Sequence, residues 1–215
     1  MIFQSLEPEA FIGILLALVI GITCHEFMHA FVADQLGDHR PRALGRVSLN
    51  PLAHIDPVGA IFFLLAGFGW GRPVPVNPSA LRPGRVGMTY VALAGPLTNL
   101  VVATTFAVAF RAMDLAGLTF DFPFVASVLL FVVLFNVTLC FFNLIPIPPL
   151  DGYNVLLPLL PPRTAYTIQR YAQYGILVLL LLVVLPSYTG GGGPLSVLFD
   201  AASWVTRLLV GRLGA

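Results

Sequence analysis

The sequence predicts an all-α, polytopic membrane protein with about four to six transmembrane helices. Of its 215 residues, 58% are hydrophobic and only 10% are charged, whereas about a quarter of the residues in an average soluble domain carry charge. The mean hydropathy is +0.90, and long apolar runs recur along the chain. Because so few side chains are polar, we expect the chain to be embedded in a bilayer rather than dissolved in water.

The composition also disfavours other classes of protein. The formal net charge is +1 and the basic residues form no dense cluster, which argues against nucleic-acid binding. The apolar run near the N-terminus is longer than the core of a signal peptide and contains polar residues, so we expect it to be retained as the first span. One membrane-embedded domain is expected over residues 1–215, with a core at about 10–155 and C-terminal helices at about 155–213.

The first span is expected at about residues 10–36. As a helix it would be about 40 Å long, which exceeds the roughly 30 Å hydrocarbon core of a bilayer. Gly37 is positioned to cap its C-terminus. After the polar residues 38–57 comes an apolar stretch at 58–70. This stretch is too short to cross the membrane, and we expect it to be re-entrant or interfacial.

Three more spans are expected farther along the chain, at about 87–110, 122–142 and 171–185. The proline-rich residues 155–170 separate the last two spans and are expected at the membrane surface. Residues 195–213 are expected to form an amphipathic or weakly spanning helix. The elements in the C-terminal third therefore have a less definite relation to the bilayer than the first three spans.

The arginines predict the orientation in the membrane. Eight of the eleven basic residues lie in segments 37–57, 71–86 and 161–170. If residues 58–70 do not cross, these segments share one side of a cell membrane, which the positive-inside rule assigns to the cytoplasm. The N-terminus of this multi-pass protein is then extracytoplasmic. The polar residues late in the first span lie in the cytoplasmic half of the bilayer.

Residues 25–29, HEFMH, place polar side chains at membrane depth and fit the pattern H-E-x-x-H. His25 and His29 project from one face of a helix about 6 Å apart, and both can reach one zinc ion at roughly 2.0–2.1 Å. Glu26 points about 100° away from His25, where it can act as a general base on metal-activated water. Ionisable residues within a membrane are costly and mark function by default, so this cluster predicts a metal site.

A catalytic zinc ion needs a third protein ligand and an open position for water. The candidates are Asp34, Asp38, His39, His54, Asp56 and Asp151. Asp34 follows on the same helix and points away from the histidine pair. Asp151 is favoured because prolines at 146, 148 and 149 break the helix before it, and unwound backbone at membrane depth lines a cavity or is buried in protein. Gly152 is expected to permit the turn. The alternative is a helix stop followed by Asp151 as an N-cap.

Three motifs in this order resemble the site-2 protease family of intramembrane zinc metalloproteases: HEFMH at 25–29, GPLTN at 95–99 and NLIPIPPLDG at 143–152. The resemblance covers about residues 10–155. No insertion is long enough for a PDZ or CBS domain, so the chain is similar to short, core-only members. The resemblance implies regulated intramembrane proteolysis, in which peptide bonds of transmembrane or membrane-proximal helices are hydrolysed.

The resemblance also implies roles for the site residues. One Zn²⁺ ion per chain would be bound by His25, His29 and Asp151, with Glu26 as the catalytic base. A short re-entrant β element would lie near the active site. The implied partners are a transmembrane protein substrate and the lipid bilayer, and no nucleic acid is expected. The oligomeric state is not implied.

Three further polar residues have a functional and a purely structural interpretation. Asn143 matches the family's asparagine before the LDG motif and would contact the substrate backbone or the developing oxyanion; alternatively it makes a capping or interhelical hydrogen bond. Asn99 would line the active-site cavity or join helices, with Gly95 allowing close approach. His54 would be a substrate-side electrophile, a rival third ligand, or a solvated or hydrogen-bonded loop residue.

Residues 72–76, RPVPV, predict a substrate-binding strand. Alternating prolines remove the amide donors from one edge of an extended segment. The amides of Val74 and Val76 face the other edge, where an unwound substrate could pair by strand addition. The alternative is a proline-rich turn.

Two other function classes use the same residues. A metal-ion transporter or channel would need a path open to both faces and more than one weak site, and residues 11–21, FIGILLALVIG, offer no polar relay. A catalytically inactive protein that sequesters helices is not favoured, because the four implied catalytic positions all carry competent residues.

Overall fold

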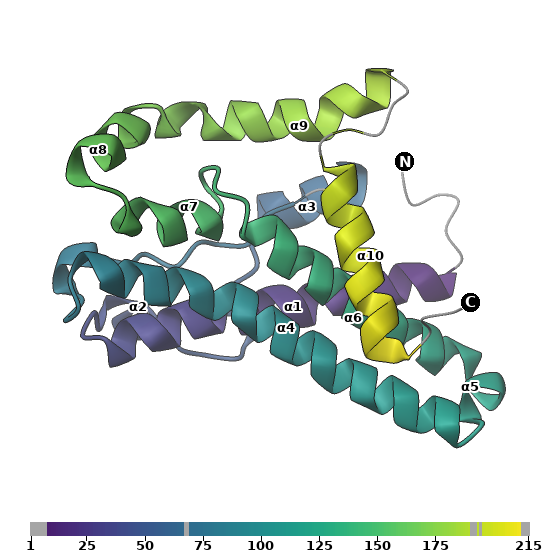
Figure 1. Cartoon of the computed structure of the whole chain (residues 1–215). Coiled ribbons are helices and arrows are strands. Elements are labelled where there is room, and N and C mark those ends of the chain that lie inside the picture. Colours follow the sequence, from purple (N-terminus) through teal and green to yellow (C-terminus); the bar gives the residue numbers. More distant parts are fainter. Residues whose placement is uncertain (1–7, 67–68, 190–192, 194, 212–215) are drawn as a thin grey trace.

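The computed structural model describes residues 8–66, 69–189, 193 and 195–211, and this part of the chain is almost entirely helical (Figure 1). Its centre consists of three long helices, α1 (Pro8–Gln35), α4 (Arg85–Leu115) and α6 (Pro123–Asn143), each of which packs against the other two. These helices correspond to the first three predicted spans. The centre is therefore a bundle in which each helix shares its buried face with two neighbours.

Length and hydropathy agree with a membrane protein. Among the described residues, α1, α4 and α6 are each long and apolar enough to cross a bilayer. A fourth crossing would combine α8 (Pro162–Arg170) with the following residues Ala172–Val184, which meet at an angle of 44°. The structure thus supports three or four spans, and four is the lower limit of the predicted range.

The first and second long helices are joined by short elements. These are α2 (Arg40–Ala43), the 3-10 turns η1 (Pro51–Ala53) and η2 (Pro78–Ala80), and between the turns α3 (Pro57–Ala66). Helix α3 is about 15 Å long, which is half of what a crossing requires. Its length agrees with a re-entrant or interfacial element. In the described chain, the only β pairing here is one antiparallel bridge between Ile55 and Gly71, and no strand is formed.

After α6 the chain turns back over the bundle. Short α5 (Leu118–Asp121) precedes α6, and α7 (Asp151–Leu156), η3 (Leu157–Leu159), α8, η4 (Ala172–Tyr174) and α9 (Gly175–Thr189) follow it (Figure 1). Large apolar side chains of α9 are exposed: Ile176, Leu177, Val178, Leu180, Leu181, Val183 and Val184. Such a surface is suited to lipid rather than to water.

Helix α10 (Ser196–Val210) crosses α6 and also packs on α4 (Figure 1). The shared core holds mostly small residues and one large one: Ala103, Ala107, Phe110, Ala126, Val133, Val137, Ala202 and Val210. Small side chains let helices approach closely. Because α10 is only about 22 Å long, it is shorter than the hydrocarbon core, and it packs against the bundle along one face.

Candidate metal centre

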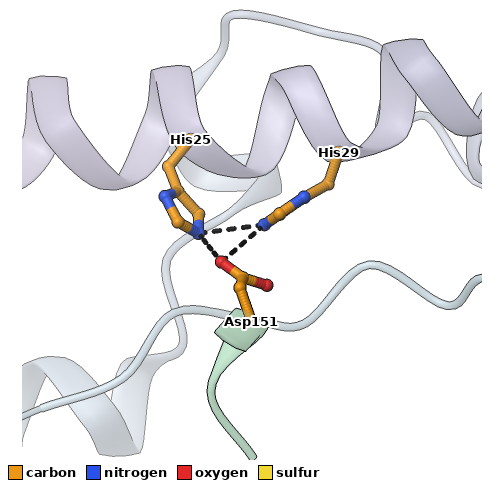
Figure 2. A group of neighbouring side chains, drawn as sticks. All are labelled: His25, His29 and Asp151. Carbon is orange, nitrogen blue, oxygen red and sulfur yellow. Dashed lines mark hydrogen bonds and ion pairs between the residues drawn. The ribbon is translucent and has the colours of Figure 1, made fainter. Parts of the chain in front are cut away.

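Three side chains from two distant parts of the chain meet within the bundle (Figure 2). His25 and His29 project from adjacent turns of α1, and Asp151 is the first residue of α7. Asp151 Oδ2 lies 3.0 Å from His25 Nε2 and 3.2 Å from His29 Nε2, and the two Nε2 atoms are 2.9 Å apart. The structure therefore brings together the helical pair and the carboxylate that the sequence favoured.

The segment that carries Asp151 is shaped by the end of α6. Helix α6 ends at Asn143 and α7 begins eight residues later, at Asp151. The N-cap of α7 is Leu150 and no side chain caps it, so the helix stop is confirmed but the N-cap interpretation of Asp151 is wrong. Its carboxylate turns towards the histidines instead of its own backbone (Figure 2).

The expected role of Gly152 also needs correction. The backbone of Gly152 does not have a positive φ, so no turn requires glycine here. A Cβ atom at this position would instead collide with the carbonyl of Leu144 and lie 2.6 Å from the carbonyl oxygen of Ile145. Glycine is needed because α7 begins in direct contact with the end of α6, and this contact holds Asp151 in place.

Gly95 lets the backbone of α4 approach the two histidines closely. A Cβ atom on Gly95 would lie 2.5 Å from His29 Nε2 and 2.6 Å from His25 Cε1. Both distances are shorter than any van der Waals contact, so the imidazoles rest against the bare backbone of α4. This confirms the expectation that Gly95 allows close approach.

Hydrogen bonds determine which ring nitrogens face the centre. His29 Nδ1 lies 2.7 Å from the carbonyl oxygen of Val91. A carbonyl only accepts, so Nδ1 is the donor and Nε2 carries the lone pair in the neutral ring. His25 Nδ1 lies 2.6 Å from Asn99 Oδ1, which orients the first ring in the same way. Partners of this kind commonly fix the tautomer of a metal-binding histidine.

The orientation of Asn99 is itself fixed by a second buried amide. Asn99 Nδ2 donates to the carbonyl of Gly21 at 3.2 Å and to Asn136 Oδ1 at 2.9 Å, and Asn136 Nδ2 donates to the carbonyl of Val132 at 2.9 Å. Both asparagines are completely buried. Asn136 was not among the residues predicted from the sequence, although an amide within an apolar span is a signal of a polar interior contact.

The two Nε2 atoms and Asp151 Oδ2 are arranged as ligands of a metal ion rather than as hydrogen-bond partners of one another. Asp151 Oδ2 is buried and has no hydrogen bond of suitable geometry, even though both ring nitrogens are near. Each Nε2 directs a lone pair into the same space, so neutral rings would repel each other and the carboxylate. Tetrahedral zinc holds its ligand atoms about 3.3 Å apart. The observed spacing is close to that value, so these three residues could hold a metal ion.

Glu26 is half-buried and lies beside the loop that follows α3. A Cβ atom on Gly71 would be 3.5 Å from Glu26 Oε1, so the carboxylate faces the backbone of that loop. His54 is completely buried, with Nε2 2.6 Å from the carbonyl oxygen of Ser48. Among the described residues, it is not part of the group that could hold a metal. His54 Nδ1 is buried without a hydrogen-bond partner in the described chain.

Among the described residues, the remaining predicted positions are not part of the group formed by His25, His29 and Asp151. Asn143 ends α6, and its Nδ2 donates to the carbonyl of Leu139 at 3.0 Å. Val74 and Val76 are half-buried and lie in residues 72–77, where the structure has neither a helix nor a turn. Asp34, one of the candidate third ligands, accepts from His39 and Arg42 instead.

The chain is similar to known zinc metalloproteases. Residues 117–185 match the model of peptidase family M50. A Bacillus subtilis protein named as zinc metalloprotease YwhC is 37% identical over 176 residues, which are 80% of this chain and 80% of that protein. No solved structure matches.

Two mycobacterial relatives carry the name zinc metalloprotease Rip2. The protein of Mycobacterium tuberculosis H37Rv is 32% identical over 219 residues, covering 95% of this chain and 81% of the relative. That of Mycolicibacterium smegmatis is 31% identical over 195 residues, covering 86% of this chain and 73% of the relative. These names give no support to the alternative of a metal transporter.

Proposed function

We propose that this chain, a zinc metalloprotease that belongs to peptidase family M50, cleaves peptide bonds of transmembrane or membrane-proximal helices within the bilayer. The observation that carries this proposal is the convergence of His25, His29 and Asp151 at the interface of helices that are long enough to span a membrane. A site built there is reached most directly by a substrate that lies in the membrane itself.

We assign His25, His29 and Asp151 as ligands of one zinc ion. When bound, zinc supplies Lewis acidity, which activates water and polarises a scissile carbonyl. The chain's own contribution to the reaction is the carboxylate of Glu26, which takes the proton from the attacking water and passes it to the leaving amine. Asn99 and Asn136 hold the His25 ring with its lone pair towards the centre.

Three polar contributions complete the proposed site. Asn143 uses one amide N–H within α6, and its second N–H is available to a substrate carbonyl or a developing oxyanion. His54 lies near the substrate path, because its carbonyl accepts from the amide of Arg72 beside Gly71. Val74 and Val76 bind the substrate backbone, so that the re-entrant β element forms only when the substrate strand is added.

The proposed topology places the arginine-rich loops and the site on the cytoplasmic side of the cell membrane, with the N-terminus outside. Helix α3 is re-entrant, and the bent α8–α9 pair provides the fourth span. Reporter fusions after Ser79, Gly117, Arg163 and Ala215 test this arrangement. An extracytoplasmic signal at Ser79 would show that α3 crosses.

A cleavage assay tests the function. The purified protein is incubated with a single-span substrate, with and without a chelator, alongside the Glu26→Gln variant. We expect cleavage by the zinc-loaded protein, loss of cleavage with the chelator, and an inactive variant that still binds zinc. Full activity of Glu26→Gln would remove this residue from the role of base, and cleavage that resists the chelator would contradict a zinc-dependent reaction.

A further inference from the structure

Residues 71–77 run alongside the part of α1 that carries the metal-site histidines. At one end, a Cβ atom on Gly71 would lie 2.9 Å from Ile22 Cγ2 and 3.5 Å from Glu26 Oε1. At the other end, Val76 packs on a buried cluster that includes Ala33. Residues 72–77 form neither a helix nor a turn, and Asn77 has the extended backbone angles φ −102° and ψ 106°. This segment is therefore extended.

A buried arginine holds the first end of the segment. The amide of Arg72 donates to the carbonyl of His54 at 2.6 Å. Beyond this point Pro73 has no N–H, so the pairing cannot continue. The Arg46 guanidinium fills the gap by donating to the carbonyls of Ala53, Arg72 and Pro73. Arg46 is 5% exposed and pairs with no carboxylate among the described residues, so its donors serve the backbone alone.

A buried carboxylate holds the second end. Asp38 is 1% exposed, and its Oδ2 accepts from the amide of Asn77 at 2.6 Å. Arg40 holds this carboxylate through two side-chain bonds of 2.9 and 3.0 Å. The segment is therefore tied at both ends by charged side chains that come from the loop after α1.

Between these ends lie two backbone amides without a hydrogen-bond partner among the described residues. In the described part of the chain, no hydrogen bond is made by the amide of Val74 or Val76. Both amides point to the same edge of the segment as the amide of Arg72. Residues 54–55 pair with this edge only as far as Arg72, because η1 turns the chain away beyond that point. An open edge of this kind is a template for strand addition.

We propose that Arg46 and Asp38 are positioning residues, which hold residues 72–77 extended beside the metal site, the form that the substrate pairing proposed above requires of Val74 and Val76. This inference rests on the proposed function, because it supplies the step that precedes hydrolysis. A helical substrate hides its amides in its own hydrogen bonds. Pairing with a stretched edge exposes the scissile bond and holds it beside Glu26.

Amide exchange of two residues tests the pairing directly. Residues 73–76 contain only two backbone amides that exchange, Val74 and Val76, since both prolines lack one. Zinc-loaded Glu26→Gln protein is mixed with a synthetic apolar peptide of about 20 residues, and deuterium uptake is followed by mass spectrometry. Without the peptide, we expect both amides to exchange fast. With the peptide, exchange should be slower by about tenfold or more, because stable hydrogen bonds protect amides from exchange. Peptide that does not bind, or binds without this protection, overturns the proposal.

A matched pair of variants tests the positioning role. Asp34 and Asp38 are both buried near the C-terminal end of α1 and both pair with an arginine, but only Asp38 reaches the segment. We expect Asp38→Ala and Arg46→Lys to weaken peptide binding by about 10-fold to 100-fold and to lose the protection of Val74 and Val76. Asp34→Ala should keep both, and all three variants should keep zinc.

Equal effects of Asp34→Ala and Asp38→Ala would reduce the role of Asp38 to general stability and contradict the inference. The conservative Arg46→Lys variant keeps the positive charge, so a loss of binding there identifies the planar donors as the cause. The protease assignment is tested separately, by the cleavage assay on the wild-type protein with and without a chelator. The two failures can therefore be distinguished.

Discussion

The two ends of the α4–α6 pair are built from the same helices but held together in different ways. At the end near the proposed metal site, buried Asn99 bonds both to His25 and to buried Asn136. At the other end, α10 covers a core of alanines and valines around Phe110. Apolar packing depends on shape and volume, whereas buried polar contacts depend on each individual donor and acceptor. The two ends therefore depend on different interactions, individual hydrogen bonds at one end and close apolar packing at the other.

The largest expected effect comes from removing a proposed zinc ligand. Asp151→Ala would leave two protein ligands, so zinc content should fall sharply and cleavage should be lost, while the apolar end keeps the protein folded. Metal analysis of the purified variant and its unfolding temperature check both parts. Unchanged zinc content would show that Asp151 is not a ligand.

A second test exchanges glycine and alanine at the two ends of α4. Gly95→Ala would improve helix propensity by about 1 kcal/mol, yet its Cβ would collide with both imidazoles, so cleavage should fall about 100-fold. Ala103→Gly, at the apolar end, should cost about 1 kcal/mol of stability and keep zinc. A cleavage assay, zinc titration and thermal unfolding compare the two variants. If Gly95→Ala keeps its activity, the collision with the imidazoles has no effect on the site.

Adjacent buried residues of α6 give a third comparison. Asn136→Ala removes the partner of Asn99, so we expect zinc affinity to fall about 10-fold to 100-fold, along with a loss of about 1–3 kcal/mol in stability. Val137→Ala should cost about 2 kcal/mol without changing zinc affinity. Competition with a chelator of known affinity measures this difference. If both variants bind zinc equally well, the amide network has no role in orienting the ligands.

The smallest expected effect concerns charge outside the metal group. The hydrogen bond from Arg40 holds the pKa of the Asp38 carboxyl at about 2, below its usual 3.8. The folded-state pKa is the lower one, so this carboxylate stabilises the protein fully above about pH 4 and loses its contribution as the pH falls towards 2. In zinc-free protein, Asp38→Asn should flatten the fall in unfolding temperature over this range. Exposed Asp121→Asn is the control and should leave the curve unchanged.

Much of the centre could be read from local patterns. The spacing of His25 and His29 places them on one side of any α-helix, so their pairing needs no other part of the fold. The ends of α1 and α6 followed from apolar runs that stop at polar residues and prolines. Residues 72–76 were predicted to be an extended strand or a proline-rich turn, and the structure has neither a helix nor a turn there.

Only tertiary packing decided which residues from distant parts of the chain contact His25 and His29. His25 contacts Asn99 across 74 residues of sequence, and Asp151, among six candidate ligands, reaches the pair because Gly152 abuts the end of α6. Asn136 and the tethers at Arg46 and Asp38 depend on the same arrangement. The physical reason is that helix faces towards lipid and towards protein are similarly apolar, so hydropathy determines that the helices form but not how they are rotated against one another.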